Sequence, residues 1–300
     1  MIPLNGILLL DKPLGLSSNV ALQKAKRLFN AKKAGHTGSL DPLATGMLPL
    51  CFGEATKYTR FLLEEKKCYQ TTIQLGMTTT TGDGEGEVIE QKPIPPLTDK
   101  LLSDMLTTFT GQQQQIPPMY SALKHNGQPL YKLAREGKEI ERKARTITIS
   151  SLTIDKVEQT EQATYLTVTV VCTTGTYIRT LAQDMGNFLG CGGYVTMLRR
   201  LWVWPFQNEA MIPLDALYEQ SDEQRMQSLL PLEKILPQLL PSIDLAEHMV
   251  DSLNKGQHVT VQTPQLSGWI ALMTHHGALL GIGEVIGPNR IAPRRLTSTA

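Results

Sequence analysis

Two segments in which apolar and polar residues tend to alternate most constrain the fold of this chain. Residues 146–154 and 165–172 are dense in β-branched side chains, and their hydrophobic residues tend to recur at every second position. Such a period places one set of side chains on one face of a β-strand. Strand-like runs at 67–77 and 194–204 extend the pattern. The sequence therefore predicts a large mixed, mostly antiparallel sheet.

Helical patterns lie between these strand-like segments, so the predicted fold class is α+β. Residues 19–30 gather apolar side chains on one face, and Ser17 or Ser18 can cap this helix. Residues 81–87 are acidic and rich in glycine, which is typical of a hairpin tip. Helices are expected at 19–30, 52–62, 99–109, 130–134, 213–217 and 219–230, with one more ending near 189, and strands at 6–11, 67–77, 120–124, 146–154, 165–172 and 194–204.

The C-terminal part of the chain has a different pattern. Prolines cluster at Pro231, Pro237 and Pro241, and short strand-like runs follow at close spacing. Close spacing of short strands is typical of a small β-barrel. The expected domains are 1–240 and 241–300.

Composition excludes several classes of protein. Hydrophobic residues make up 41% and charged residues 19% of the 300 positions, which is typical of a globular protein. No apolar run reaches membrane-spanning length and no signal peptide is recognised, so we expect a soluble protein of the cytoplasm. The four cysteines form no CxxC pair and are expected to be reduced, buried thiols. No metal and no cofactor motif is expected.

Positive charge is concentrated in particular parts of the chain. The net charge is +1, yet residues 1–60 hold eight Lys or Arg against three Asp or Glu. A second basic run lies between Lys124 and Arg145. Such runs are often only solvated surfaces, but they also suit a polyanion such as RNA.

The segment 36–50 holds a single carboxylate, Asp41, in apolar surroundings. Glycines and prolines, including Gly46 and Pro49, interrupt the segment, and we expect neither a plain helix nor a plain strand. One interpretation is that Asp41 only opens a turn before Pro42. The other is a catalytic carboxylate on a rigid, partly buried loop. Spacing alone does not separate the two.

Residues 35–46, with 11–18 ahead of them, resemble the signature of the TruB-type tRNA pseudouridine synthases of bacteria. Further blocks at 67–69, 116–124, 175–181 and 198–201 resemble the same family in the same order. The resemblance implies an isomerase that acts on uridine-55 in the T loop of tRNA. It also implies an RNA-gripping insertion at about 124–145 and a PUA-like RNA-binding domain at 241–300.

The resemblance also implies roles for individual residues. Asp41 would form a transient bond to sugar or base, or stabilise a cationic sugar, and the sequence leaves these routes open. Tyr69 would stack on the base and take a sugar proton. Independently of the resemblance, a buried carboxylate needs a cation or hydrogen-bond donors, and Arg179 is the candidate expected beside Asp41. If its segment begins extended, Tyr177 and Arg179 point the same way. The expected catalytic residues are Asp41, Tyr69 and Arg179, and the expected substrate-binding residues are His36, Tyr69, Tyr177, Leu198 and Lys12.

The expected partner is the T stem-loop of tRNA, with no membrane and no obligate protein partner, and the chain is expected to act as a monomer. Lys12 is expected either to bind phosphate or to support the fold. An accessory role in tRNA folding follows from the resemblance. The alternative is a noncatalytic RNA-binding or RNA-folding protein on the same scaffold, which would lack the aspartate that is present here as Asp41.

Overall fold

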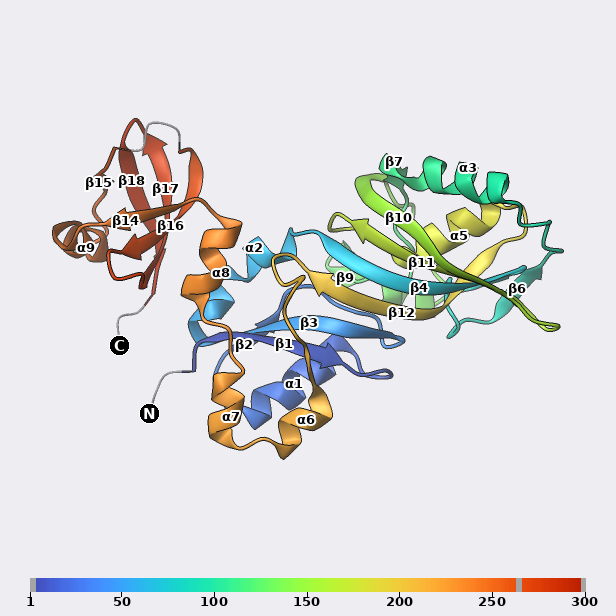
Figure 1. The fold of residues 1–300 in the computed structure, drawn as a ribbon, viewed down its shortest axis with the longest axis horizontal. Coiled ribbons are helices and arrows are strands. Elements are labelled where there is room, and N and C mark those ends of the chain that lie inside the picture. The colour runs from blue at the N-terminus through green and yellow to red at the C-terminus, as the bar shows by residue number, and fades with distance from the viewer. Residues whose placement is uncertain (1–3, 263–265, 298–300) are drawn as a thin grey trace. The chain divides into compact units, whose positions relative to one another are not determined.

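The fold consists of two compact units (Figure 1). The computed structural model describes residues 4–262 and 266–297. The first unit takes in the described residues within 1–40, 48–63 and 205–300, and the second takes in 41–47 and 64–204. Strand β3 (Ala44–Phe52) therefore belongs to both units, because the boundary falls within it.

The first unit holds one end of the large sheet and a basic helix. The strand order is β13 (Ile212–Pro213), β1 (Gly6–Lys12) and β3, and β2 (Ala34–His36) pairs with β3 as well. Helix α1 (Ser18–Leu28) begins after Ser17, whose side chain accepts a hydrogen bond from the Val20 N–H, as the N-cap position favours. The helices α6 (Leu214–Glu219) and α7 (Asp222–Gln227) follow β13.

Strand β3 corrects the expectation that residues 36–50 form no strand. Gly46 has a φ of +98°, and a Cβ atom there would lie 2.2 Å from the carbonyl oxygen of Arg200 on the paired strand. Glycine therefore lets the two backbones approach, as at a bulge. Pro49 lacks an N–H, but its carbonyl oxygen accepts a hydrogen bond from the Thr37 N–H at 3.1 Å. Both residues look like strand breakers in the sequence, yet the sheet accommodates them.

The second unit holds most of the large sheet. From β3 its order continues with β12 (Gly193–Val203), β4 (Lys67–Leu75), β11 (Thr164–Cys172), β10 (Arg145–Gln159) and β7 (Gly111–Gln115). The β12–β3 pair is parallel and the others are antiparallel. This confirms the expected mixed, mostly antiparallel sheet and the α+β class.

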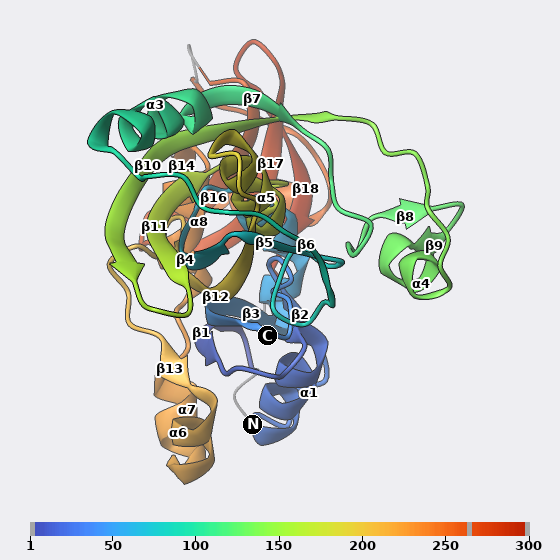
Figure 2. The same cartoon turned by 90° about the vertical axis from the view of Figure 1, so that its right-hand side faces the viewer.

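Two helices pack on this sheet and two hairpins extend from it. Helix α3 (Asp99–Phe109) packs on β10, and α5 (Ile178–Phe188) packs on β4 and β12. The short hairpins are β5 (Met77–Thr79) with β6 (Val88–Gln91), and β8 (Lys124–His125) with β9 (Gln128–Pro129). Figure 2 shows β8, β9 and α4 (Leu130–Arg135) standing off the large sheet.

Several expected elements differ in the structure. Residues 120–123 form bends and irregular backbone rather than a strand, and only Lys124 enters β8. Residues 111–115 form the strand β7, although a run of glutamines shows no alternation of polarity. The backbone of β7 pairs with β10, and such pairing needs no particular side chain. The segment 52–62 is only partly α-helical, because a 3₁₀ helix, η1 (Gly53–Tyr58), precedes α2 (Thr59–Leu63).

The C-terminal part forms a curled five-stranded sheet, in keeping with the expected small β-barrel (Figure 1). The strand order is β14 (Ser242–Leu245), β16 (Gly268–Thr274), β17 (Leu279–Gly287), β18 (Arg290–Leu296) and β15 (Val259–Thr260). Helices α8 (Leu232–Leu239) and α9 (Glu247–Asn254) flank β14 in the chain. The sheet has its own apolar core, which includes Leu253, Ile270 and Leu272. The boundary at residue 241 stays a prediction.

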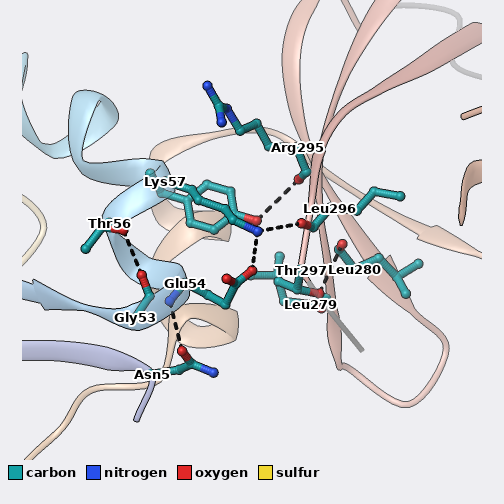
Figure 3. A network of polar contacts seen from close by, with 11 residues as sticks. Asn5, Gly53, Glu54, Thr56, Lys57, Leu279, Leu280, Arg295, Leu296 and Thr297 are labelled. Atoms are coloured by element: carbon teal, nitrogen blue, oxygen red, sulfur yellow. Dashed lines mark hydrogen bonds and ion pairs between the residues drawn. The ribbon is translucent and has the colours of Figure 1, made fainter. Parts of the chain in front are cut away.

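Polar contacts connect this C-terminal sheet to η1 within the first unit (Figure 3). The Lys57 ammonium donates to the Leu296 carbonyl at 3.3 Å, and the Tyr58 hydroxyl donates to the Arg295 carbonyl at 3.3 Å. The Arg60 guanidinium lies 4.0 Å from the centre of the Trp269 ring, within the range of a cation–π contact. The C-terminal sheet therefore contacts η1 and α2 through specific side chains.

Two expectations from composition can be compared with the structure. All four cysteines are free and buried, which confirms the expectation of reduced core thiols. Among residues 4–262 and 266–297, no helix has both the length and the apolar character needed to cross a membrane.

Candidate active site

Asp41 lies in the second unit, in the connection between β2 and β3. Its carbonyl oxygen accepts a hydrogen bond from the Ala44 N–H at 3.0 Å, so Asp41 does open a turn before Pro42. Its side chain remains 43% exposed and its Oδ2 lies 3.0 Å from Nε of Arg179. The turn and the charged site are therefore both present, and the two interpretations of the sequence do not exclude each other.

Arg179 is a buried cation with fixed partners on several sides. Its side chain is 5% exposed, and besides Asp41 its Nε lies 3.5 Å from Oδ2 of Asp83. Its Nη1 donates to the Thr81 carbonyl at 2.9 Å, and its Nη2 donates to the Tyr120 carbonyl at 2.6 Å. A guanidinium needs such a set of acceptors when it leaves water. These contacts fix the direction from which it meets Asp41.

Arg179 reaches this place from a helix, not from an extended segment. Tyr177 is the N-cap of α5, and Ile178 begins the helix. The condition under which Tyr177 and Arg179 are expected to point the same way, an extended segment, is therefore not met beyond Tyr177. The pairing of Arg179 with Asp41 follows from chemistry and is present in the structure.

Asp83 is a second carboxylate at this site that the sequence analysis did not identify. Its side chain is only 4% exposed. Oδ1 accepts hydrogen bonds from the Thr81 hydroxyl and, at 3.1 Å, from the Glu85 N–H. Asp83 thus belongs to the folded turn, while its Oδ2 faces Arg179. Its acidic, glycine-rich surroundings look like an exposed hairpin tip, which hides this role in the sequence.

Tyr69 lies on β4, opposite Arg200 of β12. It is 8% exposed, and its hydroxyl hydrogen-bonds with the Arg200 side chain. Burial raises the pKa of Tyr69 above its usual value, the Arg200 charge opposes this, and the Asp41 charge adds to it. Tyr69 is therefore a neutral phenol at neutral pH, close enough to Asp41 for the two to interact.

Arg200, which the sequence analysis also missed, is almost completely buried, at 1% exposed. Its Nε donates to the Met47 carbonyl at 2.6 Å. It therefore connects Tyr69 with the strand that follows Asp41. Only the register of β4 against β12 reveals this, because 131 positions of sequence separate the two residues.

Tyr177 and Leu198 belong to the same unit as Asp41. The Tyr177 backbone is held by the Gln115 side chain, which accepts from its N–H at 2.8 Å and donates to its carbonyl at 3.1 Å. Burial raises the pKa of the Tyr177 hydroxyl, the Arg145 charge lowers it and the Asp41 charge raises it. Leu198 is 5% exposed and pairs with Ala44. Both residues therefore belong to the neighbourhood of Asp41.

His36 and Lys12 belong to the first unit, whereas Asp41 and the residues around it belong to the second. His36 ends β2 opposite Leu50 and is half-buried. Lys12 is fully buried, and its ammonium donates to the carbonyls of Pro13 at 2.9 Å and Leu16 at 2.6 Å. Of the two roles expected for Lys12, these contacts favour support of the fold over phosphate binding.

Comparison with known proteins places this geometry in a family. Residues 26–178 match the TruB family pseudouridylate synthases (N-terminal domain). Residues 179–237 match the tRNA pseudouridylate synthase B C-terminal domain, and residues 241–297 match the C-terminal domain of pseudouridine synthase II TruB. The chain belongs to the TruB family.

Relatives in the TruB family are similar to this chain over almost its whole length. The tRNA pseudouridine synthase B of Coxiella burnetii (strain RSA 493 / Nine Mile phase I) is 48% identical over 98% of this chain and 95% of the relative. The protein of the same name from Ectopseudomonas mendocina (strain ymp) is 49% identical over 98% of this chain and 96% of the relative.

A solved structure shares the TruB fold of this chain at lower sequence identity. The chain resembles one in the crystal structure of a Cbf5-Nop10-Gar1 complex with a TM-score of 0.74 and 24% identity, over 97% of this chain and 84% of the other. This likeness supports the fold alone.

Proposed function

We propose that this chain isomerises uridine-55 in the T loop of tRNA to pseudouridine. Membership of the TruB family and relatives named tRNA pseudouridine synthase B support the substrate and the reaction class. The single observation that carries the proposal is the Asp41 carboxylate, which is partly open to solvent and 3.0 Å from a buried guanidinium. This supports a reactive carboxylate rather than only a turn residue.

The reaction conserves atoms and electrons. The bond from N1 of uracil to C1′ breaks, the ring turns, and a bond from C5 to C1′ forms. The proton on C5 leaves and N1 gains one. Asp41 either forms a transient bond to the sugar or base or stabilises a cationic sugar. No external redox partner is needed for such an isomerisation.

The target base must leave the RNA stack before one carboxylate can reach its sugar and ring. Tyr69 supplies a ring beside Asp41 for the base, with its hydroxyl held by Arg200. Because Tyr69 is a neutral phenol at pH 7, we propose that it stacks on the base, and that it takes a sugar proton only if its own hydroxyl proton passes to another acceptor in the same step. Tyr177 and Leu198 complete the walls of the pocket.

The remaining contacts to RNA are proposed to come from other parts of the chain. His36 would contact bases of the T loop, the insertion at about 124–145 would grip the stem, and residues 241–300 would bind further along the tRNA. The chain would act as a monomer in the cytoplasm, where its substrate lies, without an obligate protein partner. The same grip on the T arm would give an accessory role in tRNA folding.

A tRNA transcript provides the direct test, with pseudouridine located by primer extension after carbodiimide treatment. Wild-type protein should modify position 55, both in full tRNA and in an isolated T stem-loop. Asp41→Asn should lower turnover by at least ~10⁴-fold, about 5.5 kcal/mol of barrier. Its RNA affinity should stay within about tenfold, ~1.4 kcal/mol. Near-normal turnover of Asp41→Asn would refute the assignment, and binding without any pseudouridine from wild type would favour a noncatalytic RNA-folding protein.

A further inference from the structure

Ser18 makes an unusual pair of contacts at the start of α1. Its hydroxyl accepts a hydrogen bond from the Leu40 N–H at 2.7 Å and donates one to the Leu40 carbonyl at 3.1 Å. Ser18 is 3% exposed and Leu40 is 6% exposed, so water does not compete freely for these groups. A hydroxyl can both accept and donate, and here one side chain satisfies both backbone groups of one residue.

Leu40 needs such a partner because its segment has no regular structure. Residues 37–43 lie between β2 and β3 without helix or strand, and no ladder fixes their backbone along its whole length. Leu40 is also the residue directly before Asp41. The backbone that leads into the carboxylate is therefore fixed at Leu40 by a side chain from α1.

Ser18 is itself held in place by its neighbours in the first unit. The buried Lys12 ammonium donates to the carbonyls of Pro13 and Leu16, which fixes the turn that leads into α1. Ser17 then caps the helix through the Val20 N–H at 3.3 Å. The position of the Ser18 hydroxyl is thus set by a turn with a buried cation on one side and by a capped helix on the other.

We propose that Ser18 is a positioning residue for Asp41. Its hydroxyl fixes the backbone of Leu40 and so sets the direction in which the Asp41 side chain leaves the chain, while Arg179 fixes the carboxylate itself. This rests on the proposed function, in which Asp41 carries the chemistry. A misdirected carboxylate lowers the rate of the chemical step without changing the surface that binds RNA.

Two neighbouring serines allow a matched test. Ser18→Ala leaves the Leu40 N–H and carbonyl without their partner, whereas Ser17→Ala removes only the helix cap. Both substitutions remove one hydroxyl from adjacent positions, and both are expected to lower stability. Only Ser18→Ala should slow the single-turnover rate of pseudouridine formation, by at least ~30-fold, with the tRNA Kd within about twofold of wild type. Ser17→Ala should keep its single-turnover rate within about twofold.

Two further variants separate positioning from packing. Ser18→Thr keeps a hydroxyl and should restore most of the rate. Ser18→Cys keeps the size of the side chain but offers a weak donor and acceptor, so it should remain slow. If Ser18→Ala does not fold, the comparison of the Thr and Cys variants decides the question, and equal wild-type rates for both would overturn the proposal.

The same assay distinguishes this inference from the proposed function. Asp41→Asn is included throughout, and its loss of activity is required before the Ser18 variants are interpreted. A folded Ser18→Ala protein with a wild-type rate beside an inactive Asp41→Asn protein would overturn the role of Ser18 alone. Active Asp41→Asn protein would overturn the catalytic assignment itself.

Discussion

The clearest test of the charge arrangement is the substitution Asp83→Asn. Asp83 and Asp41 share one guanidinium, at 3.5 Å and 3.0 Å from its Nε. The substitution removes one negative charge but keeps the size of the side chain. The amide oxygen can still accept from the Thr81 hydroxyl and the Glu85 N–H. The amide nitrogen then takes the place of Oδ2, so the substitution replaces a charged acceptor beside Arg179 with an uncharged donor.

The expected loss of stability follows from burial. Two unit charges about 4 Å apart attract each other by ~4 kcal/mol at an effective dielectric constant of about 20. Removing one partner of a buried ion pair typically costs ~3–5 kcal/mol, because the other charge loses its compensation. Asp83→Asn keeps the two hydrogen bonds within the turn, and Arg179 keeps Asp41 and two carbonyls. We therefore expect a fall in the free energy of unfolding at the low end, about 3 kcal/mol.

The expected effect on catalysis is smaller than that of Asp41→Asn. Without the Asp83 charge, the guanidinium is neutralised by Asp41 alone, so Asp41 becomes a weaker nucleophile or a weaker stabiliser of positive charge. Two carbonyl contacts still orient the guanidinium. The single-turnover rate should fall by about tenfold to a hundredfold, ~1.4–2.7 kcal/mol. The tRNA Kd should not change, since Asp83 is buried.

The matched control is Glu85→Gln, which removes one negative charge from an exposed position of the same turn. Urea unfolding gives stability, and single-turnover kinetics with saturating enzyme give the chemical rate. Glu85→Gln should change neither the free energy of unfolding nor the activation free energy of the chemical step by more than about 0.5 kcal/mol. If Asp83→Asn proves as mild as Glu85→Gln in both measurements, the shared-guanidinium argument is wrong.

Three other outcomes are expected. Replacing both Lys24 and Arg27 by glutamate should weaken tRNA binding. It should also lower the slope of log Kd against log salt by ~0.7–0.9 for each phosphate that the protein no longer neutralises. An unchanged slope would show that neither side chain contacts phosphate. A chain ending at residue 240 should fold and still isomerise uridine, with weaker RNA binding and an exposed Tyr58 seen in its fluorescence; a folded but inactive fragment would contradict this. Burial, and to a lesser extent the Arg200 charge, lowers the pKa of Lys67 from 10.5 to about 8. Between pH 8 and 10.5 the unfolded state therefore binds more protons than the folded state, and the free energy of unfolding of wild type should rise with pH by up to ~3 kcal/mol relative to that of Lys67→Met. Urea unfolding measures this difference, and a difference that stays constant over that window would refute the reasoning.

The sequence predicts what depends on local pattern. The strands β10 and β11 follow the alternation of β-branched residues, and α3 covers the expected residues 99–109. The pairing of Asp41 with Arg179 follows from the need of a partly buried carboxylate for a cation. These predictions succeed because each rests on neighbouring residues or on the chemistry of two side chains.

The sequence does not reveal contacts that depend on register and on tertiary approach. Gly46 and Pro49 look like strand breakers until the close approach of the Arg200 backbone is known. The hydroxyl of Ser18 meets Leu40, 22 positions away, through the packing of α1. The periodicity of a sequence gives no information on such contacts, because it shows which face of an element a residue lies on but not which distant residue it contacts.

The number of acceptors that a buried arginine needs implies that Arg179 has partners besides Asp41. A guanidinium has five N–H donors, and a single carboxylate cannot satisfy them in a dry site. Arg179 therefore had to find more than Asp41, and Asp83 is the second acid that meets its Nε. Which of the two carboxylates is reactive is then a question of exposure: Asp41 is 43% exposed and Asp83 4%, although both meet the same nitrogen. Asp83 holds the cation in place, and the greater exposure of Asp41 supports the proposal that Asp41 is the reactive carboxylate.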